Sequence, residues 1–194
     1  TVAMKNVLLL FAVNGVTTIR GMLGHPLHLP LRNEVEKGNL VAPHLYIAGP
    51  GLTGGNVVTP QAADSIVRSE KKDGYDFLKI LPGITRVNFD GLVKTAKEVN
   101  IPFAGHVPSD VGVWRAIEAG YATIDHLDGF VEALVTDLAT IPENKRGLFA
   151  MHIAKKADTS KIDSLVRALA KAEVWVVPTQ ALAVRWFTPL ESPE

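Results

Sequence analysis

The sequence contains no cysteine among its 194 residues, which excludes both a disulfide framework and a thiolate metal site. It also has no excess of either charge, because 20 basic residues balance 20 acidic ones. That balance argues against a nucleic-acid footprint and against a polybasic membrane patch. The longest apolar run, residues 7–13, is too short to span a bilayer. We therefore expect a small-molecule substrate as the partner, with no nucleic acid and no membrane.

The same apolar run lacks the basic stretch and the cleavage site of a signal peptide. The absence of cysteine fits a cytoplasmic location, which we expect for this chain. If the chain is a fragment that has lost an N-terminal signal, its location is unknown.

The composition is that of an ordinary globular protein, with 47% hydrophobic and 21% charged residues. The length suits one domain over residues 1–194. Apolar periodicity, caps and turn residues predict an alternation of helices and strands. The helices are expected at 2–13, 27–37, 59–73, 86–99, 110–119, near 143–155 and at 160–172. The strands are expected at VTTIR (16–20), HLYIAG (44–49), DFLKIL (76–81), PFAGHV (102–107), ATIDHL (122–127) and VWVVPT (174–179).

Six strands separated by helices predict an α/β fold with parallel strands and right-handed crossovers. Two architectures fit, an open doubly wound sheet or most of an eight-stranded TIM barrel. A complete barrel needs about 250 residues, which is more than this chain has. Six consecutive barrel repeats without the first and last strands would give this pattern.

Three residues stand near the carboxyl ends of consecutive predicted strands: Lys79, His106 and His126. In a parallel barrel those strand ends converge on the face that carries the chemistry. Imidazole nitrogens and carboxylate-type oxygens suit zinc and similar divalent ions. The chain has no His-x-His pair and no late strand-end acidic residue that would complete such a site.

Each of these residues also has a simpler interpretation. Lys79 lies in the apolar stretch FLKIL, where it either extends its ammonium to solvent or carries a carboxylated amine that ligates metal. His106, at a strand-to-loop transition, could be a hydrogen-bonded structural residue. His126 ends a β-branched run, and alternation along a strand places Asp128 on its face and Asp125 on the other.

Other candidates are weaker. The remaining histidines are His25 and His28 in the loop and helix start after the first strand, His44 at the opposite end of a strand, and His152 on an exposed helix. The glycine-rich loop 49–55 only loosely resembles a phosphate loop, because it lacks both the P-loop ending and the dinucleotide-binding order of glycines. We interpret it as a loop of the active-site face.

Several segments together resemble the metal-dependent amidohydrolase superfamily, and within it the imidazolonepropionase-like and Xaa-Pro dipeptidase-like branch. They are NGVTTIRGM, LRNEVEKGNLVAPHLYIAGPGLT, GYDFLKI, AKEVNIPFAGHVP and AIEAGYATIDHLDG. The resemblance covers residues 5–130, and 160–180 more loosely. It implies a (β/α)8 barrel with one or two zinc ions, a strand-four lysine at Lys79 that is often carboxylated, and strand-five and strand-six histidines at His106 and His126.

The family also uses a His-x-His on strand one and an aspartate after strand eight, and neither has a counterpart here. If VTTIR is strand two and VWVVPT is strand seven, both elements fall beyond the two ends of the chain. The resemblance therefore implies an incomplete barrel with strands two to seven. Its open edges at VTTIR and VWVVPT predict a homo-oligomer or association with the missing barrel segments.

The implied function is metal-dependent hydrolysis of an amide or other C–N bond, as in a dipeptide, an N-acyl amino acid or a cyclic amide. Lys79, His106 and His126 are expected as metal ligands and catalytic residues, with Asp128 as a candidate substitute base. The fragment alone is expected to be inactive. Two alternatives remain, a non-catalytic α/β binding domain and an open α/β sheet that binds a phosphorylated metabolite through loop 49–55.

Overall fold

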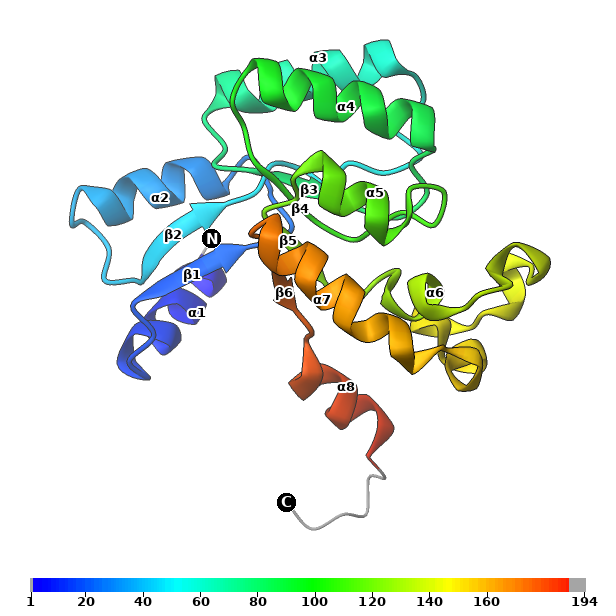
Figure 1. Cartoon of the computed structure of the whole chain (residues 1–194). Helices are drawn as coiled ribbons and strands as arrows, with labels where there is room; N and C mark the ends of the chain where they lie inside the picture. Colours follow the sequence, from blue (N-terminus) through cyan, green and yellow to red (C-terminus); the bar gives the residue numbers. More distant parts are fainter. Residues whose placement is uncertain (1, 189–194) are drawn as a thin grey trace. The chain divides into compact units, whose positions relative to one another are not determined.

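The computed structural model describes residues 2–188 and shows a mixed α/β chain (Figure 1). It divides into two compact units whose boundary lies between residues 103 and 104. The first unit contains α1 (Val2–Val13), β1 (Thr18–Gly21), α2 (His28–Glu36), β2 (His44–Ile47), α3 (Pro60–Asp73), β3 (Leu78–Ile80) and α4 (Arg86–Glu98). Strand β4 (Phe103–Gly105) begins at the boundary. The second unit continues with α5 (Gly112–Ala119), β5 (Thr123–Asp125), α6 (Phe130–Leu134), α7 (Ile162–Lys171), β6 (Trp175–Val177) and α8 (Gln180–Phe187).

Parallel pairing of strands confirms the predicted α/β class. In the first unit β1 pairs with β2, with Thr18 opposite His44 and Gly21 opposite Ile47. In the second unit β4 pairs with β5, and β5 pairs with β6. The prediction of one domain over residues 1–194 stays a prediction, since a compact unit need not fold alone.

The third helix illustrates how the sequence sets its own boundaries. The Thr59 hydroxyl accepts a hydrogen bond from the Ala62 amide at 3.1 Å, and Pro60 occupies the first helical position. Gly74 ends the helix with φ 89°, a left-handed conformation that suits glycine. Both boundaries are those that the sequence predicts.

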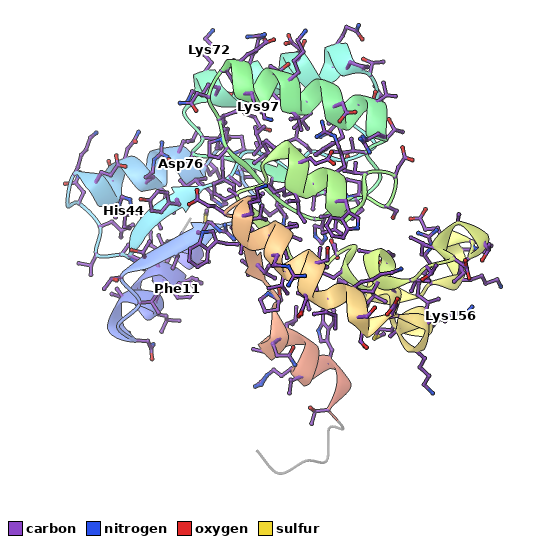
Figure 2. All side chains as sticks on the ribbon, viewed as in Figure 1. Phe11, His44, Lys72, Asp76, Lys97 and Lys156 are labelled. Atoms are coloured by element: carbon purple, nitrogen blue, oxygen red, sulfur yellow. The ribbon has the colours of Figure 1, made fainter. Side chains whose placement is uncertain are left out.

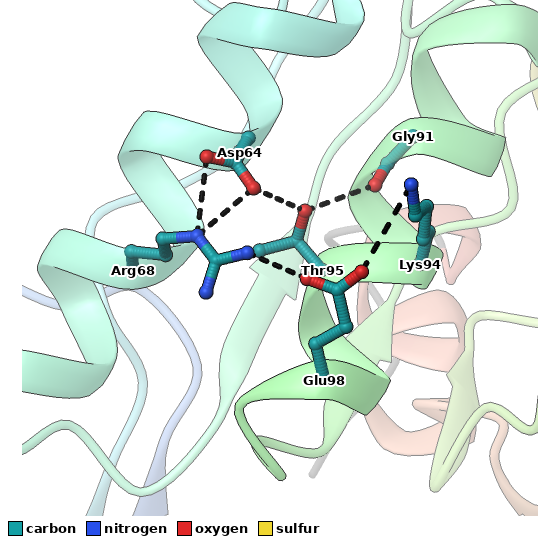
Figure 3. A network of polar contacts seen from close by, with 6 residues as sticks. All are labelled: Asp64, Arg68, Gly91, Lys94, Thr95 and Glu98. Atoms are coloured by element: carbon teal, nitrogen blue, oxygen red, sulfur yellow. Dashed lines mark hydrogen bonds and ion pairs between the residues drawn. The ribbon is translucent and has the colours of Figure 1, made fainter.

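Helices α3 and α4 lie side by side in the first unit and share a polar network at their surface (Figure 3). Arg68 donates to Asp64 at 3.0 Å and also pairs with Glu98. The Thr95 hydroxyl donates to the same Asp64 carboxylate at 2.9 Å. Beneath this network, the two helices bury Ala63, Val67, Phe89, Leu92, Val93 and Ala96. The apolar contacts carry most of the stabilisation, because exposed ion pairs contribute little.

A partly buried aspartate fixes the start of β3 against β2. The Asp76 carboxylate, labelled in Figure 2, accepts hydrogen bonds at 2.7 Å from the Ile47 amide and from the Arg32 guanidinium. Arg32 also donates to the Gly74 carbonyl at 2.9 Å. One arginine therefore ties α2 to the turn between α3 and β3.

Helix α1 is apolar apart from Lys5 and Asn6. Of its twelve residues, Leu8 alone is buried, packed with Leu45, Ile47 and Tyr75. Between this helix, β1, β2 and α2 lies an apolar cavity of about 330 Å³. No helix within residues 2–188 is long and apolar enough to cross a lipid bilayer.

Some boundaries differ from the sequence predictions. The helix expected from Ser160 starts as a 3₁₀ turn, in which the Asp158 carboxylate caps the Ser160 amide at 3.0 Å, and becomes α-helical at Ile162. The helix expected near 143–155 is two 3₁₀ segments, and the longer is broken by left-handed backbone at Phe149 and Ala150. Helix α8 was not predicted.

Glu70 of α3 is an unusual core residue. Its side chain is 4% exposed, and its Oε2 atom has no hydrogen-bond partner within the described structure. Burial, and to a lesser extent the charge of Asp73, raise the pKa of Glu70 to about 8 from 4.5. The folded state therefore favours the protonated acid, and ionising it in the core costs free energy.

The raised pKa makes stability depend on pH in a definite direction. A carboxyl whose pKa is higher in the folded than in the unfolded state contributes stability that is full below pH 4.5 and lost as pH rises through about 8. Glu70→Gln, which stays neutral, should match the wild type at about pH 4 and exceed it by at least about 1 kcal/mol at about pH 9. Urea unfolding followed by circular dichroism measures the difference. The exposed Glu118→Gln serves as the control, and an equal gain in both variants at high pH contradicts the assignment.

Candidate metal centre

The second unit brings two strand-end histidines together. His106 follows β4 directly, and His126 follows β5 directly. Because these strands are parallel neighbours, with Gly105 opposite Ile124, their carboxyl ends lie at the same edge of the sheet. The two imidazole rings lie with their centroids 4.7 Å apart and their planes tilted by 42°. The pairing predicted from their positions in the sequence is present for these two residues.

Each ring is held through its Nδ1 atom by a different side chain. His106 Nδ1 lies 2.7 Å from Asp128 Oδ2, and the two side chains are 21% and 14% exposed. His126 Nδ1 lies 2.6 Å from the Thr179 hydroxyl, which follows β6. Three neighbouring strand ends therefore supply this polar cluster.

The backbone around the cluster takes left-handed conformations that L residues rarely adopt. His126, Leu127 and Thr179 have φ of 60°, 61° and 57°. Such strain concentrates at functional sites when the surrounding structure enforces it. The conformation at His126 also ends the extended run, so the alternation that predicted Asp128 on the face of His126 does not continue. Asp128 contacts His106 instead.

Two aromatic residues around the cluster also contact it. The Tyr121 hydroxyl, deeply buried, donates to the His106 carbonyl at 2.9 Å. Burial and the nearby carboxylates of Asp128 and Asp125 raise the pKa of Tyr121 well above its ordinary value, so the phenol stays a donor. The Phe149 ring lies 6.0 Å from that of His126 and provides an apolar wall.

Lys79 lies on β3 in the first unit, and its side chain is 4% exposed. It does not extend into solvent, which was the simpler interpretation of its sequence context. Its convergence with the two histidines stays a prediction, because the histidines belong to the second unit. Its carboxylation also stays a prediction.

The donor set fits part of a metal site. Two imidazoles at this separation are ligands that zinc accepts. Among residues 2–188, however, no three His, Cys, Asp or Glu side chains form a group that could hold a metal ion. The pair therefore supplies two ligands, and a third must come from a residue of another kind, such as a carboxylated lysine, or from elsewhere.

The other histidines lie apart from this cluster in the sequence and in their contacts. His25 and His28 have ring centroids 6.0 Å apart, and burial, with the charge of His25, lowers the pKa of His28. His44 packs edge-on against Tyr46 at 4.9 Å, and His152 is exposed.

Thr179 is the residue of this cluster that the sequence did not predict. Its position just after a strand is the signal that could have found it.

The glycine-rich loop 49–55 is explained by close packing. A Cβ on Gly49 would lie 1.8 Å from the Glu70 carboxylate, and one on Gly54 would lie 2.1 Å from the Gly83 carbonyl. Most of its amides already donate hydrogen bonds within the fold. The Gly49 amide donates to the carbonyl of Phe77, just before β3, the Leu52 amide to the carbonyl of Lys79 in β3, and the Thr53 amide to the Asn56 side chain. A phosphate cradle needs amides directed at a ligand. This loop is therefore a poor phosphate site.

Comparison with known proteins places the fold among amidohydrolases. No protein-family model matches the chain, and no curated protein matches its sequence. Three solved structures are similar: a bottromycin amidohydrolase (TM-score 0.61, 23% identity, 87% of this chain and 37% of the other), a Xaa-Pro dipeptidase (0.51, 21%, 84% and 55%) and a putative prolidase from Bifidobacterium longum (0.50, 20%, 79% and 50%). These structural neighbours are amidohydrolase-family proteins, and at such identities the likeness shows a shared fold. The chain spans 37% to 55% of their lengths.

The packing of loop 49–55 predicts the effect of adding one methyl group. Gly54→Ala should lower the free energy of unfolding by at least about 2 kcal/mol, because the new Cβ meets backbone that cannot move aside. Gly55→Ala is the matched control, since its Cβ would meet nothing closer than the Thr53 hydroxyl at 3.5 Å. Urea titration of both variants measures the difference, and equal stabilities would show that the loop is not packed as described.

Proposed function

We propose that this chain is the central part of an amidohydrolase barrel, strands two to seven, that hydrolyses an amide or other C–N bond with the help of a bound metal ion. The observation that carries the proposal is the pair of strand-end histidines with their rings 4.7 Å apart and each Nδ1 held by a neighbour. The fold shared with amidohydrolases and a dipeptidase supports it. The partial coverage of those structures supports an incomplete barrel.

The proposed metal ligands are His106, His126 and a carboxylated Lys79, with zinc as the ion. A bound divalent zinc polarises a carbonyl and lowers the pKa of its bound water to around 7. The chain's own residues orient the site: Asp128 and Thr179 hold the imidazoles, and the Phe149 ring lies beside that of His126.

Asp128 has a different role from the substitute base considered from the sequence. One of its oxygens is hydrogen-bonded to His106 Nδ1 at 2.7 Å, so the carboxylate orients that ring. The proton acceptor of the reaction is then expected outside residues 2–188, as the aspartate after strand eight that the family resemblance implies.

Zinc binding tests the proposal directly. The purified chain should retain zinc after dialysis, and His106→Ala and His126→Ala should each lose it, because each removes one ligand. His152→Ala, an exposed histidine, is the control and should retain zinc. Elemental analysis by mass spectrometry gives the ratio of metal to protein. A wild-type chain without zinc would favour the non-catalytic binding domain.

Hydrolysis is tested in a longer protein that contains this chain. There, His106→Ala and His126→Ala should abolish turnover of dipeptides or N-acyl amino acids while the circular dichroism spectrum stays unchanged. Lys79→Ala should also be inactive, and short carboxylic acids should partly restore it by replacing the carbamate. Lack of restoration would count against the carbamate and leave the metal assignment in place.

We also propose that the chain associates with a second copy or with further barrel segments. Strand β6 has Trp175 75% exposed, and α1 exposes Val2, Val7, Leu10 and Val13. Single exposed apolar residues are ordinary, but a helix with ten apolar residues out of twelve is normally covered on more than one face.

Light scattering with size-exclusion chromatography measures this association. The chain should elute as a species larger than 20.9 kDa, because apolar surface and open strand edges favour contact. Leu10→Lys on the exposed face of α1 should reduce the apparent mass, whereas Lys5→Arg should leave it unchanged. A monomer at all concentrations would contradict the proposal.

A further inference from the structure

The connection between β5 and α7 is long for an α/β fold and begins at the histidine pair. It covers residues 126–161, whereas connections of this kind typically contain about 2 to 6 residues. Long connections with their own packing are commonly binding loops. This one starts at the carboxyl edge of a parallel sheet, which is the edge where α/β folds bind ligands. The connection is therefore well placed to contact a substrate.

This connection is a packed structure with a core of its own. The core consists of Val135, Ala150 and Ile153, which are buried together. An antiparallel bridge joins Val135 to Ala157. The Ser109 hydroxyl, in the loop after β4, donates to the Glu143 carboxylate at 2.6 Å. The connection is thus fastened to the loop that follows the neighbouring strand, at the same edge of the sheet.

Two successive residues in the connection have left-handed backbone. Phe149 and Ala150 have φ of 50° and 56°, and neither is a glycine. Ala150 is 1% exposed, so the packing around its methyl group holds the turn in this conformation. The turn places the Phe149 ring 6.0 Å from the His126 ring, which lies 4.7 Å from the His106 ring. Two imidazoles and one phenyl ring therefore lie together at the strand ends.

The side chains beside this phenyl ring are apolar and only partly covered. Phe149 is half-buried, and its neighbours in the sequence, Leu148 and Met151, are 54% and 46% exposed. Leu127, next to His126 in the chain, is 41% exposed. Exposed apolar side chains gather where a protein binds an apolar group, and an aromatic ring offers a large surface for that contact. The surroundings of Phe149 thus favour an apolar ligand over a charged one.

A packing role alone explains Phe149 less well than a binding role. The buried position in this turn belongs to Ala150, whereas the ring of Phe149 stays partly exposed beside an imidazole. Backbone strain is retained at ligand-contacting sites because it aims a side chain at the ligand. The left-handed turn therefore has a reason if it directs the ring at the substrate.

We propose that Phe149 is a specificity residue, whose ring contacts an apolar side chain of the substrate next to the scissile C–N bond. Substrates with leucine-like or aromatic side chains are then preferred over those with glycine. The reaction itself rests on the proposed function, whereas the contact rests on the structure of the second unit. In that reaction water adds OH to the acyl carbon, the C–N bond breaks, and the amine leaves with the remaining hydrogen. Phe149 takes no part in those steps and acts through binding alone.

Binding to the chain itself tests the contact without any catalysis. The seven phenylalanines are labelled with ¹³C in their rings, and the Phe149 signal is identified by its loss in Phe149→Leu. In NMR titrations, N-acetyl-L-leucine should shift the Phe149 signal in a saturable way, and N-acetylglycine should not. The signal of Phe11, a 40% exposed phenylalanine on α1, is the internal control and should stay in place. A Phe149 signal that neither compound shifts, or that both shift alike, overturns the proposal.

Selectivity in a longer protein that contains this chain tests the role in turnover. Phe149→Ala should lower kcat/KM for N-acetyl-L-leucine about 10- to 100-fold and leave that for N-acetylglycine unchanged, because only the larger substrate loses an apolar contact. Phe149→Leu, which keeps an apolar side chain, should retain most of the preference, and the control Phe11→Ala should retain all of it. An equal fall for both substrates in Phe149→Ala indicates structural damage and overturns the specificity role.

The two experiments together separate this inference from the proposed function. If the Phe149 signal responds to N-acetyl-L-leucine but the longer protein hydrolyses neither compound, the apolar contact stands and the hydrolytic function fails. If both compounds are hydrolysed and Phe149→Ala keeps the wild-type preference, the hydrolytic function stands and the specificity role fails.

Discussion

Parallel pairing of β4, β5 and β6 is the constraint on which the candidate site depends. Parallel strands in register end at the same edge, so the residue that follows each strand joins those that follow its neighbours. Gly105 opposite Ile124 and Asp125 opposite Val177 set that register. A slip of one residue would turn every side chain of a strand to the opposite face. Strand register thus places the two histidines side by side, and side-chain contacts then hold their rings.

Close packing has an equivalent role in the first unit. Glycines in loop 49–55 let backbone segments approach within distances that a methyl group would prevent. The same close packing places the Glu70 carboxylate against Gly49, and its Oε2 atom has no hydrogen-bond partner among the described residues. A carboxyl in that environment is neutral at ordinary pH, which explains how an acidic residue sits in the core without a basic partner.

Local chemistry made much of the fold predictable from the sequence. Thr59 with Pro60, and Gly74, marked the ends of α3, because caps depend on residues next to one another in the chain. The alternation of helices and strands predicted the α/β class, and the strand-end positions of His106 and His126 predicted that these two side chains lie together. The more specific prediction, a barrel with strands two to seven, rests on the resemblance and remains a proposal.

The unpredicted features share one cause, backbone that leaves the common conformations. The left-handed residues Phe149 and Ala150 break a helix that propensity alone would continue. His126 at φ 60° redirects Asp128, and Thr179 at φ 57° begins a helix straight after a strand. None of these residues is a glycine, whose presence would have indicated left-handed backbone in the sequence. The surrounding contacts, many residues away in the chain, decide their conformations.

The distribution of tryptophan gives the chain two separate optical signals. Trp114, Trp175 and Trp186 all follow residue 104, and all are exposed by at least 42%. Indole fluorescence therefore reports on the second unit alone, whereas the helical circular dichroism signal includes α1 to α4 of the first. Denaturation curves from the two methods would coincide if the units unfold as one cooperative block and would separate if each melts independently.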